Sequence, residues 1–127
     1  MASLIRQVVA LLNRLIQLEY DAIEACRFAV AGATNPSDRA RFGAWAADHR
    51  RHVEDLASLV RNLGGEPAAR VLRTPAPLHA QEREILRAVH RRIALAYADA
   101  ASQPGIPVDV LAVLERTLAE ERALSHD

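Results

Sequence analysis

The feature that most constrains this chain is an apolar helical stripe interrupted by two histidines. Apolar side chains recur every three or four residues from Phe42 to Leu63, and His49 and His52 fall in the same pattern. Residues with this spacing lie on one face of an α-helix, and such a face is normally buried. A buried imidazole is costly unless it has a hydrogen-bond partner or a metal ion. The stripe therefore predicts a helix whose core face carries two imidazoles that need hydrogen-bond partners or a metal ion.

Three further segments show the same helical periodicity. Glycine and proline divide the chain into four expected helices, over residues 3–31, 37–63, 78–102 and 108–127. No segment alternates apolar and polar residues as a half-buried strand does. Four amphipathic helices of this length typically pack as a bundle. The sequence therefore predicts an all-α fold, a four-helix bundle.

Short polar residues and glycine mark the expected helix ends. Ser3 is the predicted N-cap of the first helix, and Asn35 or Ser37 that of the second, because their side chains accept hydrogen bonds from free backbone amides. Gly64 and Gly65 are expected to stop the second helix, since glycine readily adopts the left-handed conformation of a C-cap.

Each expected core face contains a polar residue near the middle of its helix. Glu19 is on the first helix, His49 and His52 are on the second, His90 is on the third, and Glu121 lies somewhat beyond the middle of the fourth. The midpoints of helices packed side by side meet at one level, whichever way each helix runs. These five side chains are therefore expected to converge in the core.

The chain also reads as two copies of one helical hairpin within a single domain over residues 1–127. The expected hairpins cover residues 3–64 and 78–127. Residues 65–77 between them span roughly 40 Å if extended, at about 3.3 Å per residue, which is the length of a helix of about 27 residues. We expect this connector to run the length of the bundle, with Val71 and Leu72 packed against it.

Composition excludes several classes of protein. Lys and Arg together number 16, as do Asp and Glu, so the formal net charge is zero and neither nucleic acid nor an acidic membrane is an expected partner. One cysteine allows no intramolecular disulfide and no cysteine-based metal cluster. The apolar N-terminal segment is interrupted by charged and polar residues, so no membrane span or signal peptide is indicated, and a cytoplasmic location is expected.

Several segments resemble the ferritin-like superfamily, and in particular the small bacterial, rubrerythrin-related proteins of unassigned function. The resemblance covers nearly the whole chain and is clearest at residues 15–25 (LIQLEYDAIEA), 48–53 (DHRRHV) and 63–67 (LGGEP). It implies a ferritin-like four-helix bundle with one long connector between the second and third helices.

The resemblance also implies a metal site. Ferritin-like di-iron sites use a Glu from each of two helices and a Glu-x-x-His pair from each of the other two. Matched by position, Glu19 and His90 correspond to the two glutamates that stand alone on their helices. His49 and His52 correspond to one of the two Glu-x-x-His pairs. His49 and His90 therefore stand where the di-iron pattern has glutamate.

The other pair departs further from the di-iron pattern. Glu121 and Leu124 take its two places, and a leucine cannot bind metal. Two carboxylates remain in the core, which balance the charge of one divalent ion of Fe, Zn, Mn or Ni rather than a pair of irons. We therefore expect one transition-metal ion, no organic cofactor and no rapid iron oxidation. The candidate metal ligands are Glu19, His49, His52, His90 and Glu121.

Four neighbours are candidates to orient these ligands. Tyr20 and Tyr97 are potential hydrogen-bond donors, although tyrosines at the edge of a bundle core more often serve packing. Asp48 and Glu120 precede core positions and are expected to face solvent unless they rotate inward. Cys26 is interpreted as a small core residue.

Two functions remain open. The first is a metal-binding ferritin-like protein, with a stress- or redox-related role implied by the resemblance. The second is a structural or interaction module, in which the same residues form a metal-free buried network that fixes helix register. A homodimer is the expected partner in either case. No substrate is indicated, and an enzymatic activity is not expected.

Overall fold

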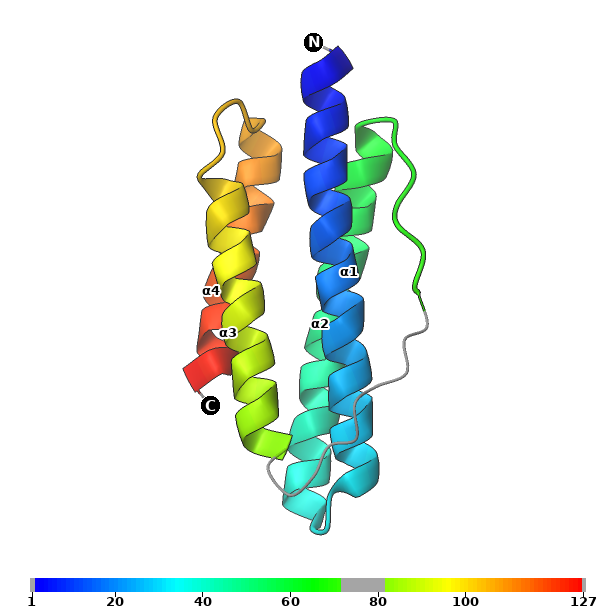
Figure 1. Cartoon of the computed structure of the whole chain (residues 1–127), viewed down its shortest axis with the longest axis vertical. Helices are drawn as coiled ribbons and strands as arrows, with labels where there is room; N and C mark the ends of the chain where they lie inside the picture. The colour runs from blue at the N-terminus through cyan, green and yellow to red at the C-terminus, as the bar shows by residue number, and fades with distance from the viewer. Residues whose placement is uncertain (1, 72–81, 127) are drawn as a thin grey trace.

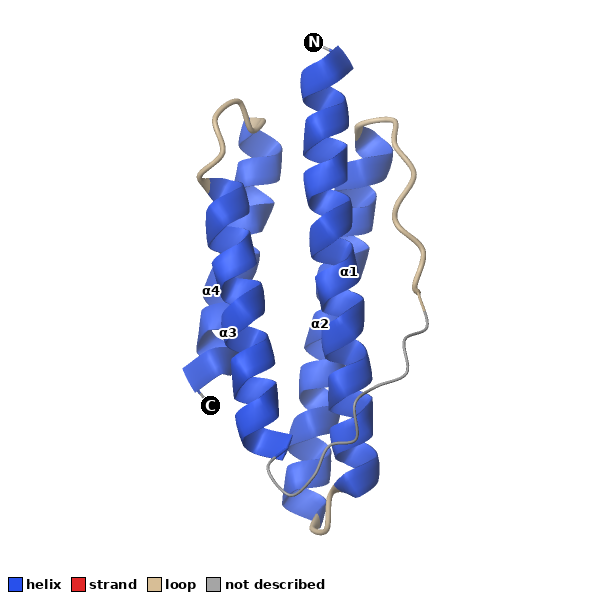
Figure 2. Ribbon diagram, viewed as in Figure 1, coloured by secondary structure: helices blue, strands red, loops and turns tan. Residues whose placement is uncertain are grey.

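The structure is a computed structural model that describes residues 2–71 and 82–126. It contains α1 (Ala2–Gly32), α2 (Pro36–Asn62), α3 (Glu82–Ala101) and α4 (Val108–His126) (Figure 1). No strand occurs in these two ranges, as the ribbon in Figure 2 shows. The predicted all-α fold with four helices is confirmed. In the part of the chain that the structure describes, no helix is long and apolar enough to cross a bilayer.

The helix ends follow local sequence signals, with one exception. The side chain of Asn35 accepts a hydrogen bond from the backbone amide of Asp38 at 2.8 Å and caps α2. Gly64 follows α2 with a φ of +83°, which only glycine adopts without strain. The predicted N-cap at Ser3 is wrong, because the backbone is already helical at Ala2. The predicted start of the third helix, at residues 78–81, lies outside the described residues.

The two middle helices are parallel. α2 ends near the end of the bundle where the N-terminus lies, whereas α3 begins at the opposite end (Figure 1). α1 packs along α2 and α3 packs along α4, so the bundle consists of two antiparallel hairpins. Parallel middle helices cannot be joined by a tight turn. The predicted long connector between them is therefore confirmed.

A single asparagine fixes the start of this connector. The side chain of Asn13 on α1 donates a hydrogen bond to the carbonyl of Glu66 at 3.1 Å and accepts one from the amide of Ala68 at 2.7 Å. Ala68 packs against the core. The prediction that Val71 packs against the bundle is wrong, since that side chain is 53% exposed. Leu72, predicted to pack beside it, lies outside the described residues.

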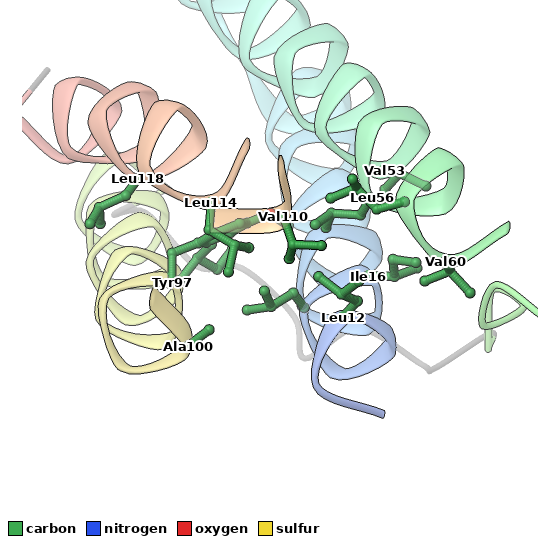
Figure 3. Close-up of a cluster of buried hydrophobic side chains, with 14 of the residues drawn as sticks. Leu12, Ile16, Val53, Leu56, Val60, Tyr97, Ala100, Val110, Leu114 and Leu118 are labelled. Atoms are coloured by element: carbon green, nitrogen blue, oxygen red, sulfur yellow. The ribbon is translucent and has the colours of Figure 1, made fainter. Parts of the chain in front are cut away.

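The apolar core consists of two clusters of unequal size. Figure 3 shows the larger one, to which all four helices contribute. The smaller one lies around Phe42 and Trp45 and includes Cys26, Leu86 and Leu124. On α2, α3 and α4, the buried polar residues come between members of the two clusters along the helix. The core therefore contains a polar layer with apolar packing on either side.

The core face of α4 differs slightly from the one expected. Val110 is fully buried, whereas Leu111, expected on the core face, is only partly buried. Thr117 is also buried, beside Leu118. The buried face of α4 runs from Val110 through Leu114 to Glu121. Glu121 therefore lies in the core, as expected, although Leu111 does not share this face.

We expect two glycine-to-alanine substitutions to change stability in opposite directions. Gly64→Ala forces a Cβ into the left-handed region and should lower the free energy of unfolding by about 1 kcal/mol. Gly43→Ala lies inside α2, where a Cβ meets no described atom within 4 Å, and should raise it by about 0.5–1 kcal/mol. Urea unfolding of both variants measures the two effects. Equal changes of the same sign would contradict the assignment of the helix end.

Candidate metal centre

The five polar residues predicted to converge are all completely buried. Each has an exposed fraction of 0%, which is rare for Glu and His without strong partners. All four helices contribute to this layer, so its assembly requires both hairpins. The five residues are Glu19 of α1, His49 and His52 of α2, His90 of α3 and Glu121 of α4.

Four of the five form one compact group, called here the His–Glu cluster: Glu19, His49, His52 and Glu121. Each offers a ligand atom within 4.8 Å of the others. His49 donates from Nδ1 to Oε1 of Glu19 at 2.6 Å. Nδ1 of His52 lies 2.9 Å from Oε1 of Glu121 and 3.0 Å from Oε2 of Glu19. Nδ1 of His49 also lies 3.4 Å from Oε1 of Glu121, so each carboxylate lies close to both imidazoles.

His90 lies beyond His49 and outside that group. Its ring centroid is 5.0 Å from that of His49 and 5.0 Å from that of Trp45. His90 instead shares a second group with His49 and Cys26, whose ligand atoms again lie within 4.8 Å of one another. The sequence interpretation of Cys26 as a core residue missed this grouping. A signal was present, because Cys26 follows Glu19 by two helical turns on the same stripe.

The residues predicted to orient the cluster differ in what they contact. Tyr97 donates a hydrogen bond from its hydroxyl to Oε2 of Glu19 at 2.8 Å. Glu120 reaches Nε2 of His52 at 2.5 Å, so it turns inward rather than to solvent. Asp48 bonds to an arginine, Arg51, that also bonds to Glu120. Tyr20 packs against the core, and no hydrogen bond joins it to the cluster among the described residues.

Mutual hydrogen bonds outweigh burial in setting the charges of this layer. Burial raises the pKa of Glu19, but hydrogen bonds from His49 and His52 outweigh it and lower that pKa to about 2. Burial lowers the pKa of both histidines, but hydrogen bonds with Glu121 and Glu19 raise it to about 9 for His49 and about 10 for His52. Without a metal ion, the cluster therefore pairs two imidazolium groups with carboxylates.

Burial raises the pKa of two neighbours of the cluster, Cys26 and Tyr97. It raises the pKa of the Cys26 thiol to about 12, and the charges of Glu121 and Glu19 add to the effect. It also raises the pKa of Tyr97 well above its ordinary value, so this hydroxyl stays a donor to Glu19. Both groups are neutral at physiological pH.

Two buried atoms in the layer have no hydrogen-bond partner among the described residues. They are Nε2 of His49 and Oε2 of Glu121. An unsatisfied buried polar atom costs about 1–3 kcal/mol, more when it is charged. Both atom types are common ligands of transition metals. The hydrogen bonds within the layer thus leave two metal-binding atoms unused.

A family model described as a domain of unknown function (DUF2383) matches residues 7–74. The chain belongs to this family. The DUF2383 match covers α1, α2 and the start of the connector, so it includes Glu19, His49 and His52 but neither His90 nor Glu121. The comparison with curated proteins gave no significant match.

A solved structure resembles this DUF2383 protein over both hairpins, including the second one, which the family model does not match. It is described as a crystal structure of ferritin-like, diiron-carboxylate proteins from Bacillus anthracis str. Ames. The two structures superpose with a TM-score of 0.84 over 96% of this chain and 92% of the other, at 21% sequence identity. The fold of the DUF2383 protein is therefore ferritin-like over both hairpins, as the sequence predicted.

We expect loss of the hydroxyl to lower the free energy of unfolding much more at Tyr97 than at Tyr20. Tyr97→Phe removes the hydroxyl donor to Oε2 of Glu19, which then keeps only its contact with His52, and should lower the free energy of unfolding of the metal-free protein by about 1–2 kcal/mol. Tyr20→Phe removes a hydroxyl with no role in the cluster and should change it by less than about 0.5 kcal/mol. Chemical unfolding in the presence of a chelator compares them. Equal losses would show that Tyr97 does not support Glu19.

The metal-free protein should be most stable in mildly acidic solution. The raised pKa values of His49 and His52 give stabilisation that is complete below their ordinary value of 6.5 and is lost as pH rises through about 9–10. The lowered pKa of Glu19 gives stabilisation that is complete above 4.5 and is lost as pH falls toward 2. Thermal unfolding across pH should therefore show a maximum between about 4.5 and 6.5.

A matched variant tests the alkaline side of that profile. His49→Gln with His52→Gln removes both titrating imidazoles and should flatten the fall in stability between about pH 7 and 10. If the fall persists unchanged in this variant, other groups cause it.

Proposed function

We propose that this protein is a metal-binding ferritin-like bundle whose His–Glu cluster binds one divalent transition-metal ion, namely Fe, Zn or Mn. The observation that carries the proposal is Oε2 of Glu121, a buried carboxylate oxygen without a hydrogen-bond partner among the described residues. Glu121 belongs to a group of four residues whose ligand atoms already approach within 4.8 Å of one another. Glu19, His49, His52 and Glu121 would hold the ion, which would give this oxygen a partner and take the place of the protons that now join imidazole and carboxylate.

The donor set fits one ion and does not fit a pair of irons. Two irons need bridging carboxylates to offset their charge, and the fully buried part of the layer has only Glu19 and Glu121 among the described residues. Leu124, in the place of a histidine ligand, packs in the smaller apolar cluster. Two carboxylates and two imidazoles suit a single Zn, Fe or Mn ion. That this protein does not oxidise iron rapidly stays a prediction.

The surrounding residues position the ligands. Tyr97 holds Glu19 in place through Oε2, and Glu120 contacts the outer nitrogen of His52. Such partners orient the ligands and increase metal affinity. A bound ion would supply Lewis acidity and, with iron or manganese, a one-electron redox couple. A redox- or stress-related role is part of the proposal and is supported only by the resemblance to rubrerythrin-related proteins.

One observation favours the alternative, a metal-free network in a structural or interaction module. The raised pKa values of His49 and His52 balance the carboxylate charges without an ion. In that case the layer fixes the register of the four helices, and a homodimer remains the expected partner. The unpartnered atoms of His49 and Glu121 support the metal-binding function instead, because a network kept only for structure gains nothing from leaving them unsatisfied.

Metal content separates the two functions. We expect protein carrying Cys26→Ala, in which the His–Glu cluster is intact, to retain about one equivalent of Mn²⁺ or Zn²⁺ after dialysis, by elemental analysis. Adding His49→Ala and His52→Ala should abolish retention. Retention should also weaken as pH falls below 9, since an ion competes with protons for both imidazoles.

The matched control changes two exposed residues of the same helix. Arg50→Ala with Glu54→Ala, in the same Cys26→Ala background, should leave the metal content unchanged, because both side chains point away from the core. Equal metal content in the double-histidine variant and this control would exclude the His–Glu cluster as the binding site.

A further inference from the structure

His49 presents its two ring nitrogens to two different groups of residues. Nδ1 donates to Glu19 at 2.6 Å and lies 3.4 Å from Glu121, so this nitrogen belongs to the His–Glu cluster. Nε2 is buried and has no hydrogen-bond partner among the described residues. Because the two nitrogens point to opposite edges of the ring, Nε2 is available to whatever lies on the other side of His49.

A thiol and a further imidazole also lie close to His49. Ligand atoms of Cys26, His49 and His90 lie within 4.8 Å of one another, and all three side chains are completely buried. They come from α1, α2 and α3, so they approach a common point from three directions. We propose that Cys26, Nε2 of His49 and His90 form a second cation site, which takes a thiophilic ion such as Zn²⁺.

The hydrogen bond from His49 to Glu19 is the arrangement that a metal-binding histidine needs. Such a histidine typically donates its other ring N–H to a carboxylate, which fixes the tautomer and turns the free nitrogen toward the ion. Here Glu19 accepts that hydrogen bond, and Tyr97 in turn holds Glu19. When the second site is occupied and the His–Glu cluster is metal-free, Glu19 is therefore a positioning residue rather than a ligand.

The donor set selects the kind of ion. One thiolate and two imidazoles suit Zn²⁺ or another thiophilic ion and disfavour Mg²⁺, Ca²⁺ and Mn²⁺, which prefer oxygen. The ligand atoms lie within 4.8 Å of one another and would have to draw somewhat closer to reach zinc–ligand bonds of about 2.0–2.3 Å. Binding transfers the thiol proton of Cys26 to solvent, and the metal–sulfur bond offsets the cost. Three protein ligands leave a fourth position open.

The surroundings of the three ligands also suit a dehydrated, thiophilic ion. Cys26 belongs to the smaller apolar cluster, where Phe42, Trp45 and Leu86 are its buried neighbours. Trp45 packs against the ring of His90 edge to face, which restricts the rotation of that imidazole. A cysteine that served packing alone needs no imidazole nitrogens beside it, whereas the sulfur of Cys26 has a nitrogen of each of two histidines within 4.8 Å.

The test uses Co²⁺ as a spectroscopic substitute for Zn²⁺. Thiolate bound to Co²⁺ gives an intense near-ultraviolet charge-transfer band, and the chain has one cysteine, so the band reports on Cys26 alone. We expect the band in the wild-type protein and in His52→Ala, which changes only the His–Glu cluster. We expect it to vanish in Cys26→Ala and to require at least about tenfold more Co²⁺ in His90→Ala, since loss of even an orienting group costs that much.

The outcomes separate this site from the His–Glu cluster. Absence of the band in wild-type protein, or an unchanged Co²⁺ requirement in His90→Ala, overturns the second site. Continued Co²⁺ binding by Cys26→Ala without the band is the expected result and leaves the His–Glu cluster intact. Loss of all binding in Cys26→Ala with a strong band in wild type supports the second site and counts against the cluster. Circular dichroism confirms that each variant is folded, and Cys26→Ser replaces Cys26→Ala if the latter is not.

Discussion

The structure depends on a layer of polar side chains buried across the middle of an otherwise apolar bundle. A buried carboxylate or imidazole is tolerated only when its partner lies at the same level. The hydrogen bonds of Glu19 to His49 and of His52 to Glu121 therefore fix the relative heights of three helices. Apolar packing alone tolerates sliding by a turn, because one leucine replaces another. Sliding of α1, α2 or α4 would leave a buried charge unpaired.

His49 and His52 occupy similar positions on one helix but have different environments. Both nitrogens of His52 face carboxylates, those of Glu121 and Glu120, so its hydrogen-bonding capacity is used. His49 has a carboxylate partner on one side only, and its other side faces the smaller apolar cluster. The layer is therefore asymmetric, with acidic groups toward one side of His49 and a thiol toward the other.

The sequence predicted the fold well because both of its signals are local. Helical periodicity and glycine–proline breaks are read along the chain, and the depth of Glu19 and His49 within their helices follows from counting residues. The grouping of Cys26 with His90 was missed because it depends on how far α1 and α3 are rotated toward each other, which no single helix encodes. The prediction that Val71 packs against the bundle was wrong for a similar reason. The connector is held by a polar contact from Asn13, whereas hydrophobicity suggested packing.

The division of the layer between two hairpins has a consequence for how the chain folds. The contact between Glu19 and His49 closes a loop of 30 residues within one hairpin, whereas those from Tyr97 to Glu19 and from Glu121 to His52 join residues 78 and 69 positions apart. Contacts close in sequence form before distant ones, because their loops cost less entropy to close. We therefore expect each hairpin to form while its polar groups are still hydrated. We expect water to leave the layer only when the hairpins dock, so the docking step is also the one that dehydrates the charges.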